Sequence, residues 1–174
     1  MNSQSAFVDA ISNAATGPDA AEKVAARLEK FIADWGGPPP WIDSIESGAI
    51  DFLYNDDDLT IVHIVWPPHL ITEPHNHSMW AAIGLYQGRE NNILWRRNDT
   101  SIEPCGAKTI VAGEACWFDK DAIHSVHNPV DGLTGAIHVY GGDFLNANNV
   151  EWDQLTLTER PRNIAVQQAK FANS

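Results

Sequence analysis

The sequence predicts a single-domain β-barrel preceded by a short helical region. The chain has 174 residues, a length that suits one domain with its own core. Apolar side chains in the first 35 residues recur with helical periodicity. After Trp41 the sequence changes to short β-rich runs separated by turn residues. These observations together predict an all-β fold with N-terminal helices.

The N-terminal region is predicted to be helical because its apolar residues share one helical face, while the charged residues between them lie elsewhere. Pro18 suits a first helical turn, and Gly36 and Gly37, followed by three prolines, end the helix. A shorter helix is expected over residues 5–15. The apolar face comprises Val24, Leu28, Phe31, Ile32 and Trp35.

The β-rich runs predict the strands of the barrel. The runs are AIDFLY, LTIVHIVW, MWAAIGLYQG, NNILWRR, KTIVA, ACWF and GAIHVY, and between them lie NDDD, PP, RND, EPCG, AGE and PVDG. This spacing is typical of an all-β sandwich or barrel. We expect one domain over residues 1–174, with a helical appendage (1–40), a barrel (41–145) and a polar tail (146–174) that ends in a helix over 162–171.

Charge and composition exclude several classes of partner. The formal net charge is -12, and the 11 Lys and Arg residues form no visible basic stripe, which argues against nucleic acid and anionic membranes. Cys105 and Cys116 lie outside any CxxC spacing and predict two reduced, mostly buried thiols. There is no basic, apolar leader and no apolar run of about 18 residues, so a soluble cytoplasmic protein is expected.

Two histidine-containing segments suggest a metal site. In PHNHSMWAAIGLYQG, His75 and His77 are two residues apart, so in extended chain both rings point to the same side and can reach one ion. Taken alone, such a pair is also found on surfaces and in cores. A second segment, GEACWFDKDAIHSVHN, places His124 and Asn128 at fixed intervals after Gly113.

The first segment resembles the first cupin motif, HXH(X)3,4E(X)6G. His75, His77 and Gly88 stand at the motif positions, and Ala81 occupies the position of the glutamate. No other carboxylate lies beside it. The family's usual acidic ligand is therefore missing from this chain.

The second segment resembles the second cupin motif, G(X)5PXG(X)2H(X)3N. Gly113, His124 and Asn128 match, whereas Asp119 and Asp121 replace the proline and the second glycine. The departure affects the turn and leaves the ligand in place.

The resemblance implies a cupin double-stranded β-helix, a jelly-roll barrel, whose metal ligands are three histidines. Such a site leaves coordination positions open for substrate. Neutral ligands do not compensate the ion's charge, which favours an anionic donor such as a thiolate. Fe(II) suits the site if O2 is used, and Zn, Ni and Mn are the alternatives. The ligand set is His75, His77 and His124.

A third segment, GAIHVYGGDF, resembles the SxHxY strand of cysteine dioxygenase and of the bacterial 3-mercaptopropionate dioxygenases. His138 and Tyr140 match the family's histidine and tyrosine, and Ala136 replaces the serine. The resemblance implies that this pair is catalytic and lies beside the metal. The alternatives are a hydrogen-bonded core histidine and a tyrosine that packs in the core.

The arginines that bind substrate in these dioxygenases have no match, because Tyr54 lies near one position and no arginine occurs between Tyr140 and Arg160. Arg89, Arg96 and Arg97 are the nearest candidates by chain position, although solvated strand-edge charges are the alternative. His63 alternates with apolar residues and could face the interior. In HSMW, which resembles the HTVW of bacterial thiol dioxygenases, the tryptophan either lines the pocket or packs in the core. The candidate pocket residues are Tyr54, His63, Trp80 and Arg89.

The function implied is that of an iron(II)-dependent thiol dioxygenase, which adds O2 to the sulfur of a small thiol of the cysteine or 3-mercaptopropionate type and forms a sulfinate. Two alternatives stay open: another metal-dependent cupin enzyme, such as a non-thiol dioxygenase, lyase or isomerase, and a non-catalytic cupin that binds a small ligand. The sequence leaves the oligomeric state open.

Overall fold

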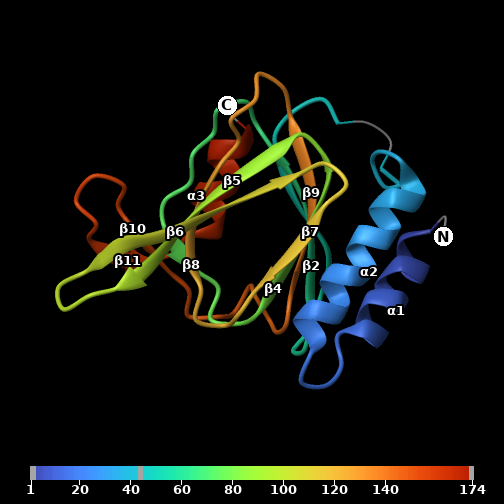
Figure 1. Cartoon of the computed structure of the whole chain (residues 1–174), viewed down its shortest axis with the longest axis horizontal. Coiled ribbons are helices and arrows are strands. Elements are labelled where there is room, and N and C mark those ends of the chain that lie inside the picture. Colours follow the sequence, from blue (N-terminus) through green and yellow to red (C-terminus); the bar gives the residue numbers. More distant parts are fainter. Residues whose placement is uncertain (1–2, 43–44, 173–174) are drawn as a thin grey trace.

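The computed structural model describes residues 3–42 and 45–172 (Figure 1). The remaining residues of the predicted domain, 1–2, 43–44 and 173–174, lie outside the described part. The helices are α1 (Gln4–Ala14), α2 (Ala20–Trp35) and α3 (Ile164–Ala172). The strands are β1 (Ala49–Asn55), β2 (Thr60–Trp66), β3 (His75–Asn76), β4 (Ala81–Gln87), β5 (Arg89–Arg97), β6 (Ile102–Val111), β7 (Ala115–Phe118), β8 (Ile123–His127), β9 (Thr134–Tyr140), β10 (Val150–Trp152) and β11 (Glu159–Pro161).

The strands form two antiparallel sheets that enclose a common interior. The five-stranded sheet has the order β1-β2-β9-β4-β7, and the six-stranded sheet has the order β11-β10-β3-β8-β5-β6. From β2 to β9 the chain passes repeatedly from one sheet to the other, which is the winding of a jelly roll. The double-stranded β-helix implied by the sequence is therefore confirmed.

Helices α1 and α2 cover the outer face of the five-stranded sheet (Figure 1). The apolar face of α2 packs there, and Leu28 is fully buried. Gly84 of β4 permits the close approach, because a Cβ at this position would lie 2.6 Å from Cδ1 of Ile32. The helix ends at Gly36, which has the left-handed conformation (φ 66°) that glycine adopts at little cost. Both predicted N-terminal helices are confirmed.

Side chains of the strands alternate between the barrel interior and the helix-covered face. On β9, Ile137 and Val139 pack in the cluster under the helices, whereas Ala136 and Tyr140 belong to clusters on the inner side. His138 lies on the same side as these inner residues, because it is two residues from each. The inner face of this strand therefore carries the two predicted catalytic side chains.

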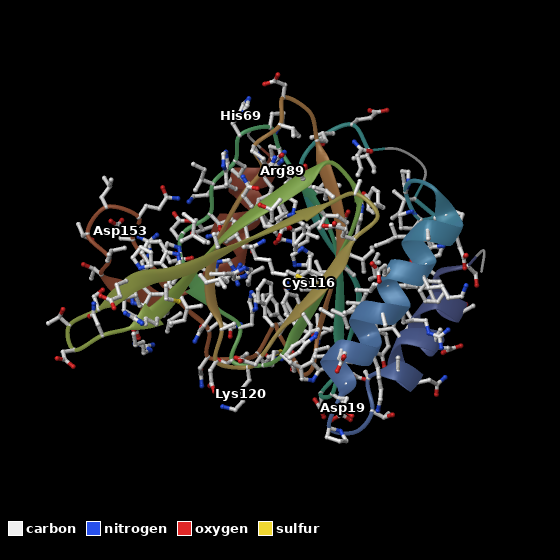
Figure 2. All side chains as sticks on the ribbon, viewed as in Figure 1. Asp19, His69, Arg89, Cys116, Lys120 and Asp153 are labelled. Atoms are coloured by element: carbon white, nitrogen blue, oxygen red, sulfur yellow. The ribbon has the colours of Figure 1, made fainter. Side chains whose placement is uncertain are left out.

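Three sequence expectations need correction. EPCG was expected to be a turn but lies within β6, so that Cys105 is exposed, while Cys116 is buried (Figure 2). Strands β3 and β8, which carry the predicted ligands His75 and His124, are short and were not among the predicted runs. Residues 146–174 form more than a tail, since β10 pairs with β3 through Glu151 and His75. The predicted terminal helix is present as α3.

Gly88 of the first motif forms the turn between β4 and β5. Its φ is 77°, and a Cβ there would lie 2.2 Å from Oγ1 of Thr134, so both backbone conformation and space require glycine. Within the part of the chain that is described, no helix has the length and hydropathy needed to cross a membrane.

Candidate metal centre

The three predicted ligands converge inside the barrel. His75 lies on β3 opposite His124 of β8, and His77 follows two residues after His75. All three are buried, with at most 4 % of their surface exposed. One ring nitrogen from each lies within 4.8 Å of the others, and the Nε2 atoms of His77 and His124 are 3.2 Å apart. Two nitrogens bound to one ion at about 2.0–2.1 Å are also roughly 3 Å apart.

Hydrogen bonds at the far side of two rings leave Nε2 free to bind a metal. Nδ1 of His75 donates to the backbone carbonyl of Glu73 at 2.9 Å, and Nδ1 of His124 donates to the amide oxygen of Asn92 at 2.6 Å. Because the proton is held on Nδ1, the lone pair of each Nε2 points to the common centre. The donor set therefore fits a divalent ion.

Burial keeps the three imidazoles neutral, which metal binding requires. The pKa of His124 is lowered to about 3, mainly by burial; Glu90 opposes this shift, while His138 and Arg162 contribute to it. The pKa values of His75 and His77 are also well below the usual range, first because of burial and then because of Arg162 and the neighbouring histidines.

Among residues 3–42 and 45–172, no carboxylate belongs to this group. Ala81, at the glutamate position of the motif, is fully buried on β4 and pairs with Tyr140 of β9. Three neutral nitrogen donors suit Fe, Zn, Ni or Cu, while oxygen-preferring ions such as Mg and Ca are poorly matched. The arrangement could hold a metal ion, whose identity the donors do not select.

His138 and Tyr140 border the same cavity as the three histidines. Nδ1 of His138 is 3.1 Å from the Tyr140 hydroxyl, and the Tyr140 ring lies 4.9 Å from that of His77. Tyr140 also stacks on Phe144, with 4.3 Å between the ring centroids. Burial raises the pKa of Tyr140, so its hydroxyl keeps its proton at neutral pH.

The cavity beside the three histidines is small. Its volume of about 30 Å³ has room for one or two water molecules. The C-terminal segment supplies Arg162, Gln167 and Phe171 to its wall. The other lining residues are Ile50, Ile64, Trp66, Thr72, His75, His77, His124, Val126, His138 and Tyr140.

Arg162 is a cavity residue that the sequence did not reveal. Its Nε and Nη1 atoms are buried and have no hydrogen-bond partner in the described structure, and its Cζ lies 5.5 Å from the Phe144 ring centroid. Burial lowers the pKa of this guanidinium, while Tyr140 and two nearby glutamates act in the opposite direction. An arginine remains charged under these conditions. The cavity therefore combines three neutral imidazoles with one incompletely paired cation.

Two further groups, Glu90 and Asn92, also escaped the sequence reasoning. Both point into the barrel from β5 and are almost completely buried. The segment RENNILW carries no signal for them, because both faces of this strand mix polar and apolar residues, and only the structure shows which face is buried.

The four predicted pocket residues do not line this cavity. His63 faces the opposite side of its sheet, where its Nε2 is 2.7 Å from the Tyr86 hydroxyl. Tyr54 hydrogen-bonds to Asp56 at 2.5 Å, and Trp80 packs against the cluster under the helices. Arg89 is exposed on the barrel surface (Figure 2), because residue 89 lies on the outer side of β5.

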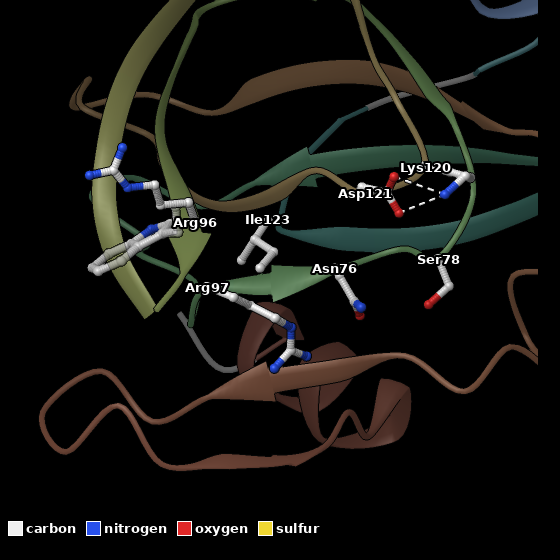
Figure 3. A pocket seen from close by; sticks show the side chains of 8 residues that line it. Asn76, Ser78, Arg96, Arg97, Lys120, Asp121 and Ile123 are labelled. Carbon is white, nitrogen blue, oxygen red and sulfur yellow. Dashed lines mark hydrogen bonds and ion pairs between the residues drawn. The ribbon is translucent and has the colours of Figure 1, made fainter. Parts of the chain in front are cut away.

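The other two candidate arginines lie in a groove outside the barrel (Figure 3). Arg96 pairs with Glu103 at 2.7 Å, and Arg97 pairs with Glu159 at 2.6 Å. The third cation of the groove, Lys120, is paired with Asp121. Arg96 and Arg97 are therefore solvated charges at the strand edge, the alternative to a role in substrate binding. The groove shares no lining residue with the histidine cavity.

No protein-family model and no curated protein matches this sequence. Solved structures of double-stranded β-helix proteins are similar. An RmlC-like cupin family protein from Methanocaldococcus jannaschii is 16% identical over 62% of this chain and 93% of that chain, with a TM-score of 0.47. A protein of unknown function with a cupin-like fold from Ralstonia eutropha is 20% identical over 67% and 64%, with a TM-score of 0.49.

The DMSP lyase DddQ from Ruegeria pomeroyi is 16% identical over 63% of this chain and 53% of that chain, with a TM-score of 0.48. Similarity at this level transfers no activity to this chain, since one fold hosts many unrelated reactions.

Proposed function

We propose that this chain is an iron(II)-dependent thiol dioxygenase whose substrate is a small thiol that also carries a carboxylate. The observation that carries the proposal is the placement of Arg162, a buried and incompletely paired cation, in the cavity of three neutral histidines. A substrate with one soft anionic donor and one carboxylate would complement both features. Cysteine and 3-mercaptopropionate belong to this class.

The residues of this chain would bind and orient the thiol. His75, His77 and His124 would hold the ion without neutralising its charge, which favours binding of the thiolate form. Arg162 would receive the carboxylate, and the Tyr140 hydroxyl would hydrogen-bond to the substrate. Iron(II), when bound, activates O2 for addition to sulfur, so that RSH and O2 give RSO2⁻ and a proton.

The walls of the cavity restrict the substrate to a small molecule. A volume of about 30 Å³ is less than a three-carbon thiol needs. Binding of such a thiol would therefore require lining groups to shift, and we favour the segment after β11 because it carries Arg162 and Phe171. The same segment would exclude water once the substrate is bound.

Oxygen uptake by the iron-loaded protein tests the proposal. We expect consumption of one O2 per sulfinate formed with 3-mercaptopropionate or cysteine, and much weaker turnover of cysteamine, which lacks the carboxylate. His77→Ala should abolish both iron retention and uptake. Absence of thiol-dependent uptake with every substrate of the panel, by protein of verified iron content, would refute the proposed function.

The same measurements separate the two alternatives. Iron-loaded protein that turns over only non-thiol substrates would identify another metal-dependent cupin enzyme. Protein that retains no stoichiometric Fe, Zn, Ni or Mn, and whose metal content is unaffected by His77→Ala, would identify a non-catalytic ligand-binding cupin.

A further inference from the structure

A buried carboxylate faces His138 across the barrel interior. Glu90 lies on β5 of the six-stranded sheet, and His138 lies on β9 of the opposite sheet. Glu90 is fully buried and His138 is 2 % exposed. Oε2 of Glu90 is 3.6 Å from Nε2 of His138, which is an ion-pair distance slightly longer than a hydrogen bond.

Oε2 of Glu90 and Nε2 of His138 are each other's ion-pair partner. Neither Oε2 of Glu90 nor Nε2 of His138 has a hydrogen-bond partner among the described residues, and both are buried. A buried polar group without a hydrogen-bond partner loses its interaction with water and gains nothing in return, which is energetically unfavourable. A shift of a few tenths of an ångström would close a direct hydrogen bond between them. The pair is therefore best understood as one interaction.

The hydrogen bonds around Glu90 assign the role of each atom. Asn92 accepts from Nδ1 of His124 with its amide oxygen at 2.6 Å, so its amide nitrogen faces Glu90 and donates to Oε1 at 3.0 Å. Oε2 is thereby left for His138. Burial raises the pKa of Glu90, but His138 and Asn92 outweigh that effect and lower the pKa overall. An ionised carboxylate can only accept, so Nε2 of His138 must carry a proton.

The SxHxY resemblance leads one to expect a serine beside His138, at position 136. Residue 136 is alanine, fully buried and two residues before His138 on the same face of β9, and its methyl group cannot hydrogen-bond. Glu90 approaches the ring from the opposite sheet instead. His138 Nδ1 remains directed at the Tyr140 hydroxyl, 3.1 Å away.

We propose that Glu90 is a positioning residue that fixes the proton of His138 on Nε2 and so sets the direction of the Tyr140 hydroxyl at the cavity. Through Asn92 the same carboxylate also orients the ring of His124. Glu90 thus connects a metal-ligand candidate with the His138–Tyr140 pair by interactions that lie wholly within the barrel. Its effect on turnover rests on the proposed function, whereas the tautomer of His138 does not.

The structure specifies what Glu90→Gln would do. Because the Asn92 amide nitrogen holds Oε1, the new side-chain NH2 would occupy the Oε2 position and donate to Nε2 of His138. The ring proton would then move to Nδ1. The change exchanges one atom for another of nearly equal size, so the core packing is retained.

Nitrogen NMR of the full-length, metal-free protein, with labelled histidine, reports the tautomer directly. The His138 signals are assigned by their loss in His138→Gln. We expect a protonated Nε2 in the unchanged protein and a switch to protonated Nδ1 with unprotonated Nε2 in Glu90→Gln. Glu103→Gln, at an exposed carboxylate on the neighbouring strand that pairs with Arg96, should leave the His138 signals unchanged.

An unprotonated Nε2 in the unchanged protein would overturn the inference, even if no variant folded. So would an identical tautomer in Glu90→Gln. In the iron-loaded enzyme we expect Glu90→Gln to lower kcat about 10- to 100-fold, with a smaller change in KM. If the tautomer results are as expected but no thiol supports oxygen uptake, the proposed function fails and the positioning role of Glu90 stands.

Discussion

Arg162 and Arg160 lie two residues apart in the C-terminal segment but are expected to affect stability in opposite directions. Nε of Arg160 donates to Glu151 at 2.8 Å, whereas the buried Nε and Nη1 of Arg162 have no hydrogen-bond partner among the described residues. Substitution of each by methionine preserves most of the stem and removes the guanidinium. If Arg162 is kept for binding an anion, its removal should not weaken the metal-free fold.

The magnitudes follow from these contacts. An unpaired buried donor costs about 1–3 kcal/mol, and the cation–π contact of Arg162 with Phe144, at 5.5 Å, offsets roughly 0.5–2 kcal/mol. We therefore expect Arg162→Met to raise the free energy of unfolding by about 1 kcal/mol or leave it unchanged. Arg160→Met leaves the buried Glu151 with fewer hydrogen-bond donors and should lower the free energy of unfolding. The expected loss is only about 1–2 kcal/mol, because Arg160 itself is half-exposed.

Urea unfolding of the metal-free protein measures both values, and thermal unfolding should show shifts of about 2–4 °C per kcal/mol for a chain of this size. In the iron-loaded enzyme, Arg162→Met should lower kcat/KM for 3-mercaptopropionate. The expected loss corresponds to about 2–5 kcal/mol of activation free energy, the usual effect of removing one partner of a buried charge pair. The value of kcat/KM for cysteamine should change little. Equal loss of stability in both variants, or equal loss of activity with both thiols, would refute the reasoning.

Three further predictions concern the three-histidine group and helix α3, which lines its cavity. Asn92→Ala removes the acceptor for Nδ1 of His124 and should weaken metal binding about 10- to 100-fold, as measured by competition with a chelator. Asn91→Ala, on the outer side of the same strand, serves as control. Equal metal affinities of the two variants would contradict the role of Asn92. Metal-free protein should lose stability as pH falls from 6.5 towards 3, because the pKa of His124 is about 3 in the folded state and the unfolded chain binds the proton first. The slope should be about 1.4 kcal/mol per pH unit for each buried ligand, and urea midpoints that do not change between pH 7 and 5 would exclude this contribution. Phe171→Ala should lower the free energy of unfolding by about 3–5 kcal/mol, because the ring packs 5.0 Å from Trp66. Since the ring also lines the cavity, the variant should favour longer thiols over 3-mercaptopropionate. An unchanged ratio of kcat/KM between a longer thiol and 3-mercaptopropionate would show that α3 does not limit substrate size.

The prediction of helices and most strands from the sequence succeeded for local reasons. The apolar face of α2 and the glycine that follows it are readable within one window of the chain. The same is true of the spacing of His75 and His77. The failures are short or irregular strands: β3 has two residues, too few for any alternation to be recognised. The EPCG segment has turn composition, yet pairing with β5 keeps it extended.

The composition of the candidate ligand group, three histidines without a carboxylate, could also be predicted, because residue 81 at the motif's glutamate position is alanine. Which side chains surround those ligands could not. Glu90 and His138 are 48 residues apart and come from opposite sheets, and Arg162 reaches the cavity from beyond β11. Whether such groups meet depends on strand register, on how the two sheets are superposed and on where the terminal segment folds back. These are properties of the packed barrel, in which the partners of a buried charge are set by distance in space rather than by position along the chain.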